Sequence, residues 1–296
     1  MDVQPGEVRL VHLKRCKSNC TIEYAANRSL SEDVFGEGKI KSWDELQFVL
    51  IDMVQEGNLR GMAAAISLPA NMVHMQHVEV PFNLPERQIP AEIVAQVQRE
   101  FPGMTEELSA DFILREPESK EYANLFYAAA RKEYLMHYAR CINSAGLQLK
   151  IADVDIYALQ RIVVFNDTQT DKNTDAIIYL AANQILFILH QSDELFFHQR
   201  WNIPGNDFSA EIKHKIQLFL AGLKQLNVDQ IILCSDDARL INVADYLKQA
   251  WKVPVRILNA MSKFEYTFED IATCVSEDSS QYLLAAGLSL YKVPVW

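Results

Sequence analysis

Apolar and polar positions alternate along the chain in patterns that predict short strands separated by helices. The opening stretch DVQPGEVRLVHL predicts a strand, a tight turn and a second strand whose residues 8–13 point alternately to opposite faces. The stretch KSWDELQFVLIDMVQEGNLRG predicts a helix that begins with a capping box of Ser42 and Glu45 and ends at Gly57 or Gly61. Residues 62–68, MAAAISL, predict a short buried strand.

Residues 73–152 predict a unit with the order β-α-β-β-α-β. Its segments are VHMQHVEVP, AEIVAQVQREF, SADFILRE, YANLFYAAA, RKEYLMHYARCINSAG and LQLKIADV. The stretch DVDIYALQRIVVF then predicts a helix that links two halves of the chain, and the polar residues 167–175 predict a loop.

The second half repeats the same theme of a β-hairpin sheet followed by alternating helices and strands. The predicted segments are two or three antiparallel strands in AIIYLAANQILFILH and ELFFHQRWNI, a helix in FSAEIKHKIQLFLAGLKQL, a buried strand in VDQIILCS, a helix in ARLINVADYLKQAW, a strand in VPVRILN and a last helix in SSQYLLAAGLSLY.

Composition narrows the class of protein. The 296 residues are 49% hydrophobic and carry a formal net charge of -11, which indicates a globular chain and disfavours direct binding to nucleic acid or to an anionic membrane. Five irregularly spaced cysteines are typical of reduced thiols, and "RCKSNC" lacks a second pair to complete a zinc site. No signal peptide and no bilayer-length apolar run occur, so we expect a cytosolic protein.

Local motifs for catalysis are missing from the sequence. It contains no GxxxxGK[ST], no GxGxxG and no nucleophile elbow. His74 and His77 are three residues apart on a predicted strand and so point to opposite faces, which is the wrong arrangement for a shared metal. We therefore expect no catalytic residue and no metal site.

Several phrases in the order found here resemble PilM, the actin-like cytoplasmic family of type IV pilus assembly. They are the alanine-rich strand that ends at Leu68-Pro69, the run from Ala128 to Leu147 with "AAARKE" before a helix that ends "AGL", the entry Asp153 to Asp155 to a long helix, and "AAGLSL" at 285–290. The resemblance covers essentially the whole chain and is most specific between residues 60 and 162.

The resemblance implies an α/β, actin-like (FtsA/PilM-type) two-lobed fold with an inserted β-α-β-β-α-β subdomain and a reduced second lobe. The implied domains are a first-lobe core at 1–72 completed by a C-terminal helix at 279–296, the inserted subdomain at 73–152, and a second lobe at 153–278. Only one helix, 208–225, precedes the IILC strand, where the family usually has a larger insertion.

Nucleotide in this fold is held by three glycine-bearing turns, and all three depart from the family's pattern here. The first keeps Asp2 but has Gln4 in place of the glycine, followed by Pro5, Gly6 and Glu7. The second falls at residues 179–182, where Tyr179 and Ala181 stand and both the Asp and the Gly are missing. The third follows the IILC strand as Ser235, Asp236 and Asp237.

These replacements disfavour a phosphate ligand. A carboxylate within ~5 Å of a phosphate oxygen costs about 3 kcal/mol at an effective dielectric constant of ~20. Asp236 and Asp237 are also suited to cap the helix that begins near Ala238. The sequence therefore predicts a pseudo-ATPase that binds neither ATP nor Mg²⁺.

By resemblance, the partner is a PilN-like inner-membrane protein whose short cytosolic N-terminal peptide docks between the first-domain core and the inserted subdomain. The predicted walls of this groove are Gln76, Val78 and Val80 on one side and Asp155 and Leu159 on the other. This places the protein at the cytosolic face of the bacterial inner membrane, as a scaffold. Two alternatives remain: an active actin-like ATPase, and a component of a related system such as a GspL-like domain of type II secretion or an MSHA-type pilus protein.

Overall fold

The computed structural model describes most of the chain and divides it into two compact units. The described residues are 1–16, 19–36, 39–81, 83–101, 107–114, 122–166, 174–181, 184–191, 194–202, 208–222, 228–234, 238–251, 253–269, 271–272, 275 and 279–291. Unit 1 consists of Met1–Leu30, Ala65–Ser67 and Asp155–Trp296, and unit 2 of Ser31–Ala64 and Leu68–Val154. These units group residues by packing, and the three-domain division expected from the sequence stays a prediction.

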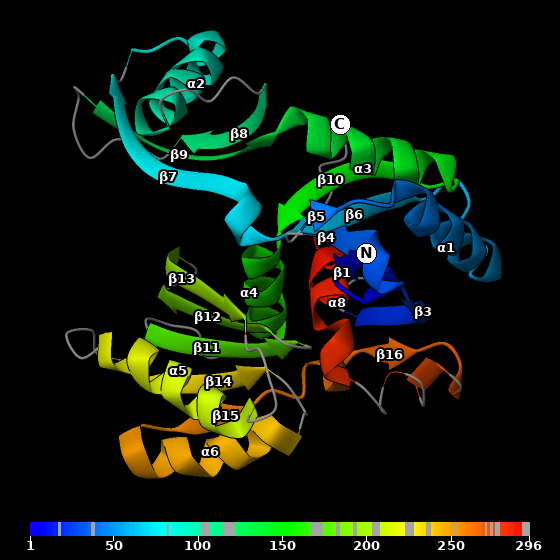
Figure 1. The fold of residues 1–296 in the computed structure, drawn as a ribbon, viewed down its shortest axis with the longest axis vertical. Helices are drawn as coiled ribbons and strands as arrows, with labels where there is room; N and C mark the ends of the chain where they lie inside the picture. The colour runs from blue at the N-terminus through cyan, green and yellow to red at the C-terminus, as the bar shows by residue number, and fades with distance from the viewer. Residues whose placement is uncertain are drawn as a thin grey trace. The chain divides into compact units, whose positions relative to one another are not determined.

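Unit 1 holds two sheets and the helices that pack on them (Figure 1). Its elements are β1 (Asp2–Gln4), β2 (Glu7–Cys16), β3 (Asn19–Ser29), α4 (Asp155–Asn166), β11 (Thr174–Ala181), β12 (Gln184–Gln191), β13 (Glu194–Asn202), α5 (Phe208–Gly222), β14 (Gln230–Cys234), α6 (Ala238–Trp251), β15 (Val255–Ile257), β16 (Glu265–Tyr266) and α8 (Leu283–Ser289), with 3-10 turns at Ala260–Lys263 and Ser279–Tyr282.

The sheets of unit 1 follow the repeated theme that the sequence predicts. One sheet has the order β1-β2-β3-β16 and the other β13-β12-β11-β14-β15. Each contains a run of three strands joined by antiparallel hairpins, and β14 and β15 extend the second sheet in parallel. A core of buried apolar residues lies between this sheet and α5 and α6, and includes Ile178, Phe187 and Leu247.

Unit 2 contains the predicted β-α-β-β-α-β order. Its elements are β4 (Phe35–Gly36), β5 (Lys39–Ile40), α1 (Trp43–Glu56), β7 (Val73–Pro81), α2 (Ile89–Glu100), β8 (Leu108–Leu114), β9 (Tyr122–Arg131), α3 (Lys132–Ser144) and β10 (Gln148–Val154), with 3-10 turns at Glu32–Val34, Ala70–Met72 and Glu86–Gln88. Strand β6 (Ala63–Leu68) contributes its ends to this unit and Ala65–Ser67 to unit 1.

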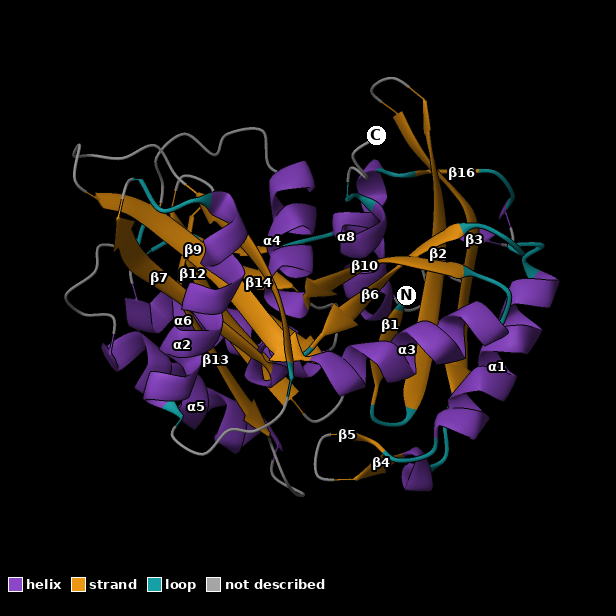
Figure 2. Cartoon of the chain, turned by 90° about the horizontal axis from the view of Figure 1, so that it is seen from above, coloured by secondary structure: helices purple, strands orange, loops and turns teal. Residues whose placement is uncertain are grey.

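Strand pairing in unit 2 separates the six segments into two sheets. β7, β9 and β8 form an antiparallel sheet, whereas β10 pairs with β6. Helix α2 covers one face of the three-stranded sheet and buries Ile93, Val97, Leu125 and Tyr127 with it. Helices α1 and α3 lie side by side (Figure 2), and Trp43 packs its ring against Tyr138.

The predicted capping box at the start of α1 is wrong. Ser42 is the N-cap residue, but its side chain makes no capping hydrogen bond. The Glu45 carboxylate instead accepts hydrogen bonds from the backbone N–H and the hydroxyl of Ser31, both at 2.8 Å. These bonds lower the pKa of Glu45 because they stabilise its charged form. Glu45 thus binds the residue that precedes the 3-10 turn Glu32–Val34 and does not cap helix α1.

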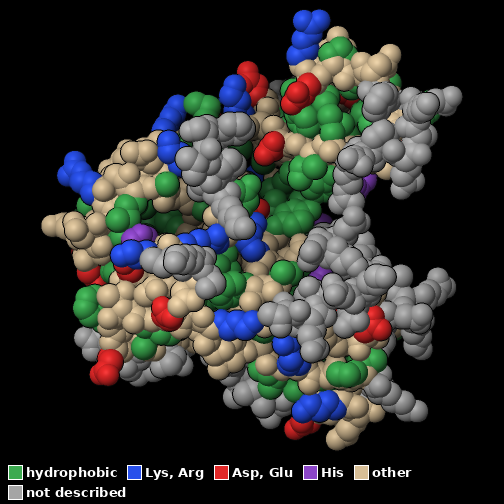
Figure 3. All heavy atoms as spheres, turned by 180° about the vertical axis from the view of Figure 1, so that it is seen from behind, with side chains coloured by type: hydrophobic (Ala, Val, Ile, Leu, Met, Phe, Trp, Pro, Cys, Tyr) green, Lys and Arg blue, Asp and Glu red, His purple; other side chains and the backbone are tan. Residues whose placement is uncertain are grey.

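Surface charge is mixed on the face opposite to that of Figure 1. Lys and Arg side chains, Asp and Glu side chains, and hydrophobic side chains are interspersed over its described part (Figure 3). Among the helices that the structure describes, none combines the length and the apolar character needed to cross a bilayer.

Candidate functional site

The first candidate site is the β1–β2 turn of unit 1, where the family's phosphate loop is expected. Gly6 has a φ of +87°, which favours glycine, and its carbonyl accepts a hydrogen bond from the Leu30 N–H at 2.8 Å. The Asp2 carboxylate is 2% exposed and accepts hydrogen bonds from the Ser67 hydroxyl at 2.5 Å and from the Gln4 amide at 3.0 Å. The turn therefore keeps its fold while its polar side chains bind one another.

A buried arginine is the cation of this region. The Arg9 guanidinium is 3% exposed, lies 3.5 Å from the Asp2 carboxylate and is paired with Glu7 at 2.6 Å. Glu7 also accepts a hydrogen bond from the Asn27 amide at 2.9 Å. Burial disfavours the charged form of Arg9, but the surrounding negative groups, Asp2 foremost, outweigh it and raise its pKa. The positive charge of Arg9 is thus already compensated within the protein.

The stretch where the second nucleotide turn is expected contributes a tyrosine to the same cluster. Tyr179 on β11 is 3% exposed, and its pKa is raised by burial and by the negative charge of Asp2. Ala181 ends this strand. The third predicted turn, Ser235, Asp236 and Asp237, lies outside the described residues, and so does the predicted capping role of its two aspartates.

The structure therefore brings together Asp2, Gln4, Glu7 and Tyr179 around Arg9. A phosphate needs hydrogen-bond donors that are not already used within the protein. The Gln4 amide and Arg9 Nη2 donate to carboxylates of this cluster, whereas Arg9 Nε and Nη1 have no hydrogen-bond partner among the described residues. Within the described residues, no group of three His, Cys, Asp or Glu side chains could hold a metal ion.

The sequence reasoning missed Arg9, although a signal was present. Val8, Leu10 and Val11 on the same strand are buried, so both faces of β2 are covered. A charged residue in a strand that is buried on both faces must be paired, because an isolated buried charge is very unfavourable.

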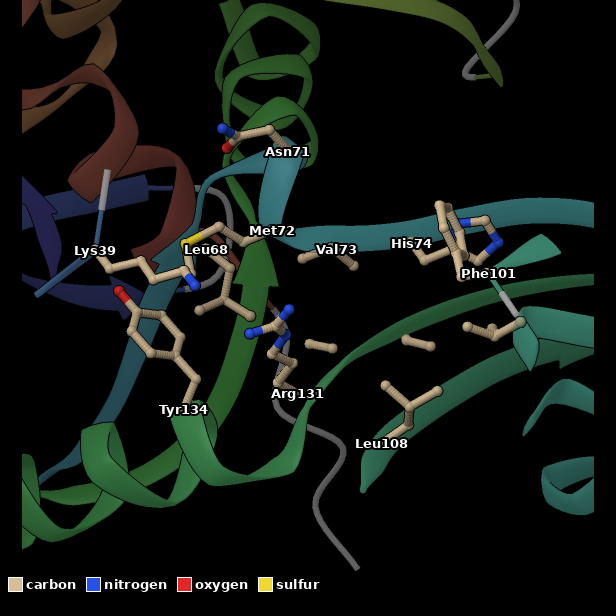
Figure 4. A pocket seen from close by; sticks show the side chains of 13 residues that line it. Lys39, Leu68, Asn71, Met72, Val73, His74, Phe101, Leu108, Arg131 and Tyr134 are labelled. Carbon is tan, nitrogen blue, oxygen red and sulfur yellow. The ribbon is translucent and has the colours of Figure 1, made fainter. Parts of the chain in front are cut away.

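The second candidate site is a cavity of about 350 Å³ in unit 2, shown in Figure 4. It is lined by the end of β6 and the turn after it, the start of β7, the end of α2, and the junction of β9 with α3. The lining residues are Lys39, Leu68, Asn71, Met72, Val73, His74, Val97, Phe101, Leu108, Ala129, Ala130, Arg131 and Tyr134. Most of this lining is apolar, and burial raises the pKa of Tyr134.

A hydrogen-bonded chain fixes one wall of the cavity. The His74 imidazole lies 3.1 Å from the Tyr127 hydroxyl and 3.2 Å from the Glu100 carboxylate. The Tyr127 hydroxyl donates to the Gln76 amide oxygen at 3.0 Å. Phe101 packs its ring edge-to-face with His74 at a centroid distance of 5.3 Å. These contacts hold the His74 ring in place between β7 and α2.

The residues predicted to bind a peptide lie elsewhere in the fold. Gln76, Val78 and Val80 are on β7 in unit 2, where Val80 is 2% exposed and Val78 packs on the same core. Asp155, 4% exposed and paired with Arg200, and Leu159, fully buried, are on α4 in unit 1. None of the five lines the cavity described above, so their binding role stays a prediction.

Sequence reasoning also missed the residues that do line the cavity. Val73 and His74 are on β7, the strand whose residues Gln76, Val78 and Val80 were predicted to bind the peptide, but they lie at the beginning of that strand. Arg131 and Tyr134 belong to the AAARKEY stretch, which stood out only by resemblance. The available signal was the direct junction of a strand with a helix at residues 131–132, since binding residues are found disproportionately on the connections between regular elements.

Comparisons with known proteins agree on the family and the fold. The family model described as type IV pilus assembly protein PilM matches residues 1–213 and 205–293. A solved PilM–PilN type IV pilus biogenesis complex is similar at 16% identity and a TM-score of 0.81, over 98% of this chain and 96% of that one. Ethanolamine utilization protein EutJ from Carboxydothermus hydrogenoformans is similar at 9% identity and a TM-score of 0.54, over 98% and 88%. The predicted actin-like α/β fold is confirmed.

Proposed function

The chain belongs to the PilM family of type IV pilus assembly proteins, and we propose that it serves there as a non-catalytic scaffold. In this proposal it docks the N-terminal cytosolic peptide of a PilN-like protein and is thereby held at the cytosolic face of the inner membrane. The similar solved structure is that of a PilM–PilN complex, which supports a partner of this kind.

The observation that carries the docking proposal is the cavity of unit 2. Its volume of about 350 Å³ is in the lower part of the range that binding pockets cover, about 300–1,000 Å³. Leu68, Val97 and Ala129 give it buried apolar walls. A leucine-sized anchor that enters it would gain about 2 kcal/mol from burial, and two or three such anchors suffice for micromolar affinity after the peptide is ordered.

The pseudo-ATPase part of the proposal is supported by the cluster around Arg9. Glu7 occupies the position after the first turn's only glycine, and it is bound to Arg9 and Asn27. In the second hairpin, where the family's Asp and Gly are both missing, Tyr179 places a buried side chain. A nucleotide would have to displace these paired groups and approach their carboxylates, which is electrostatically unfavourable.

A cavity-filling variant tests the docking proposal. Ala130 lines the cavity, whereas Ala128 is two residues away on the same strand and face and does not. We expect Ala130→Phe to weaken binding of the synthetic PilN-like N-terminal peptide at least 10-fold in calorimetry, and Ala128→Phe to change it less than 2-fold. Equal effects of both substitutions, or no binding by the unaltered protein, would contradict the proposal.

The same calorimeter tests the nucleotide part. Protein that binds the peptide is titrated with ATP and Mg²⁺, so that its folded state is established in the same sample. We expect no binding heat up to millimolar ATP. A dissociation constant in the low micromolar range, or turnover abolished by Asp2→Ala, would show that the chain is an ATPase after all.

A further inference from the structure

Strand β7 forms one edge of the three-stranded sheet in unit 2 (Figure 1). The order of this sheet is β7-β9-β8, so β7 and β8 each pair with β9 on one side only. β7 pairs with β9 over all nine of its residues, Val73–Pro81, and the register has no bulge. Every second residue of such an edge strand points its backbone N–H and C=O away from the sheet.

The outward-pointing backbone groups of β7 are unpaired along most of the strand. At its two ends, local turns use the Val73 N–H, which donates to the Ala70 carbonyl, and the Pro81 carbonyl, which accepts from the Leu84 N–H at 2.9 Å. Between these ends, no group in the described part of the chain binds the outward-pointing backbone atoms of residues 74–80. β7 therefore offers a row of free donors and acceptors.

The opposite edge of the same sheet is less suited to pairing. In β8 the Phe112 N–H donates to the Asp111 carboxylate at 2.9 Å, so a charged side chain already uses a backbone donor of this strand. A charge beside the backbone also discourages another strand from adding to an edge. β7 has no lysine, no bulge and no proline before Pro81, and Glu79 is its one charged residue. Of the two edges, β7 is thus the better site for an added strand.

The free edge of β7 continues from the cavity that is proposed to hold the peptide. Four consecutive residues, 71–74, line the cavity, and the rest of β7 follows them directly. Further along the strand, Val80 packs on the core under α2, whereas His77 lies on the other face with its ring 4.7 Å from that of Phe126. The side chains of an added strand would alternate between the same two faces.

We propose that the N-terminal peptide of the PilN-like protein binds in an extended conformation and adds a strand to the free edge of β7, with one apolar side chain anchored in the cavity. Another strand satisfies a row of backbone N–H and C=O groups, whereas a helix uses its own backbone groups internally. Main-chain hydrogen bonds then supply affinity, and alternate side chains supply specificity. This inference rests on the proposed docking function and adds the conformation and position of the bound peptide.

Methylation of single peptide amides tests the pairing, because it removes one N–H and leaves every side chain unchanged. A fluorescein-labelled peptide with the N-terminal sequence of the PilN-like protein, and versions methylated at one amide each, are titrated against the full chain by fluorescence anisotropy. In an added strand, amides that face β7 alternate with amides that face away. Beyond the anchor, we expect methylation to weaken binding at least 10-fold at every second position and less than 3-fold at the positions between.

Hydrogen exchange of the protein locates the added strand. The exchange of the full chain is followed by mass spectrometry with and without saturating peptide. β8 is the matched control, because it is the other edge of the same sheet. We expect the fast-exchanging amides of residues 75–80 to slow at least 10-fold, and those of residues 109–114 less than 2-fold. Residues 71–74 and Leu108 are left out of the comparison, because they line the cavity and an anchor alone would cover them.

The outcomes distinguish the inference from the function on which it rests. A peptide that binds but tolerates methylation everywhere, or loses affinity without alternation, overturns this inference alone. Equal slowing of exchange at both edges, or at neither, does the same. Slowing at residues 75–80 that grows with protein concentration in the absence of peptide assigns the edge to a second copy of the chain and also overturns it. No binding of the unaltered peptide overturns the docking function and the inference together.

Discussion

Replacing Gly287 by alanine should destabilise unit 1 by separating two packed helices. Gly287 lies in α8 at its contact with α4. A Cβ built there would be 2.8 Å from the Ala158 carbonyl carbon and closer still to its oxygen, although real Cβ atoms essentially never approach within 3.0 Å. The atoms in the way are backbone, so a side-chain rotation cannot relieve the clash.

The magnitude follows from two opposing effects. Overpacking of a buried site typically costs about 1–3 kcal/mol, and a backbone clash favours the upper end of that range. Alanine in place of glycine in a helix gains about 1 kcal/mol. We therefore expect Gly287→Ala to lower the free energy of unfolding by about 2 kcal/mol. Separation of the helices would also disturb the 2.8 Å hydrogen bond from Arg161 to the Gly287 carbonyl.

Gly222 provides the matched control for this substitution. It ends helix α5, and a Cβ added there meets nothing within 4 Å. Gly222→Ala should therefore leave the stability unchanged or raise it by up to about 1 kcal/mol. Urea unfolding followed by circular dichroism measures both variants. A Gly287→Ala protein as stable as the unaltered chain would refute the close approach of α4 and α8.

Three further predictions concern buried or hydrogen-bonded groups. Arg9→Met should lower the free energy of unfolding by about 3–5 kcal/mol, because it leaves the buried Asp2 carboxylate without the guanidinium beside it. Adding Asp2→Asn should restore part of this loss. Additive losses of the two substitutions in urea unfolding would contradict the pairing. The stability that Glu45 contributes should be complete above its ordinary pKa of 4.5 and should disappear as the pH falls through its lowered folded-state pKa. The difference in melting temperature between Glu45→Gln and the unaltered chain should therefore vanish in acid. A difference that persists in acid would show that the hydrogen bonds from Ser31 are not the source of this stability. Burial and the charge of Asp44 raise the pKa of Cys141 to about 12. Roughly 10⁻⁴ of the thiol is therefore ionised at pH 8, and iodoacetamide should label Cys141 only after unfolding. Labelled positions are located by peptide mass mapping, and rapid labelling of Cys141 in the native protein would contradict its burial.

Local sequence patterns sufficed for the order of the elements. The strand–turn–strand near the start of the chain, the helix after Ser42 and the β-α-β-β-α-β order predicted for residues 73–152 all appear where periodicity predicts them. These features depend on side-chain alternation and on turn residues within a few positions, which the sequence shows directly. The resemblance to the PilM family, confirmed over nearly the whole chain, supplied the fold class.

Tertiary structure alone decided the partners of these elements. The closing strand β10 pairs with β6 instead of the β7-β9-β8 sheet, and Glu45 bonds to Ser31 instead of forming a capping box with Ser42. Lys39 and Arg131 line the same cavity although they are more than ninety residues apart in the sequence. Periodicity identifies which face of a segment is buried, but not which distant segment covers it. Strand pairing, ion pairs and cavities are set by contacts between remote residues, and so only the folded chain determines them.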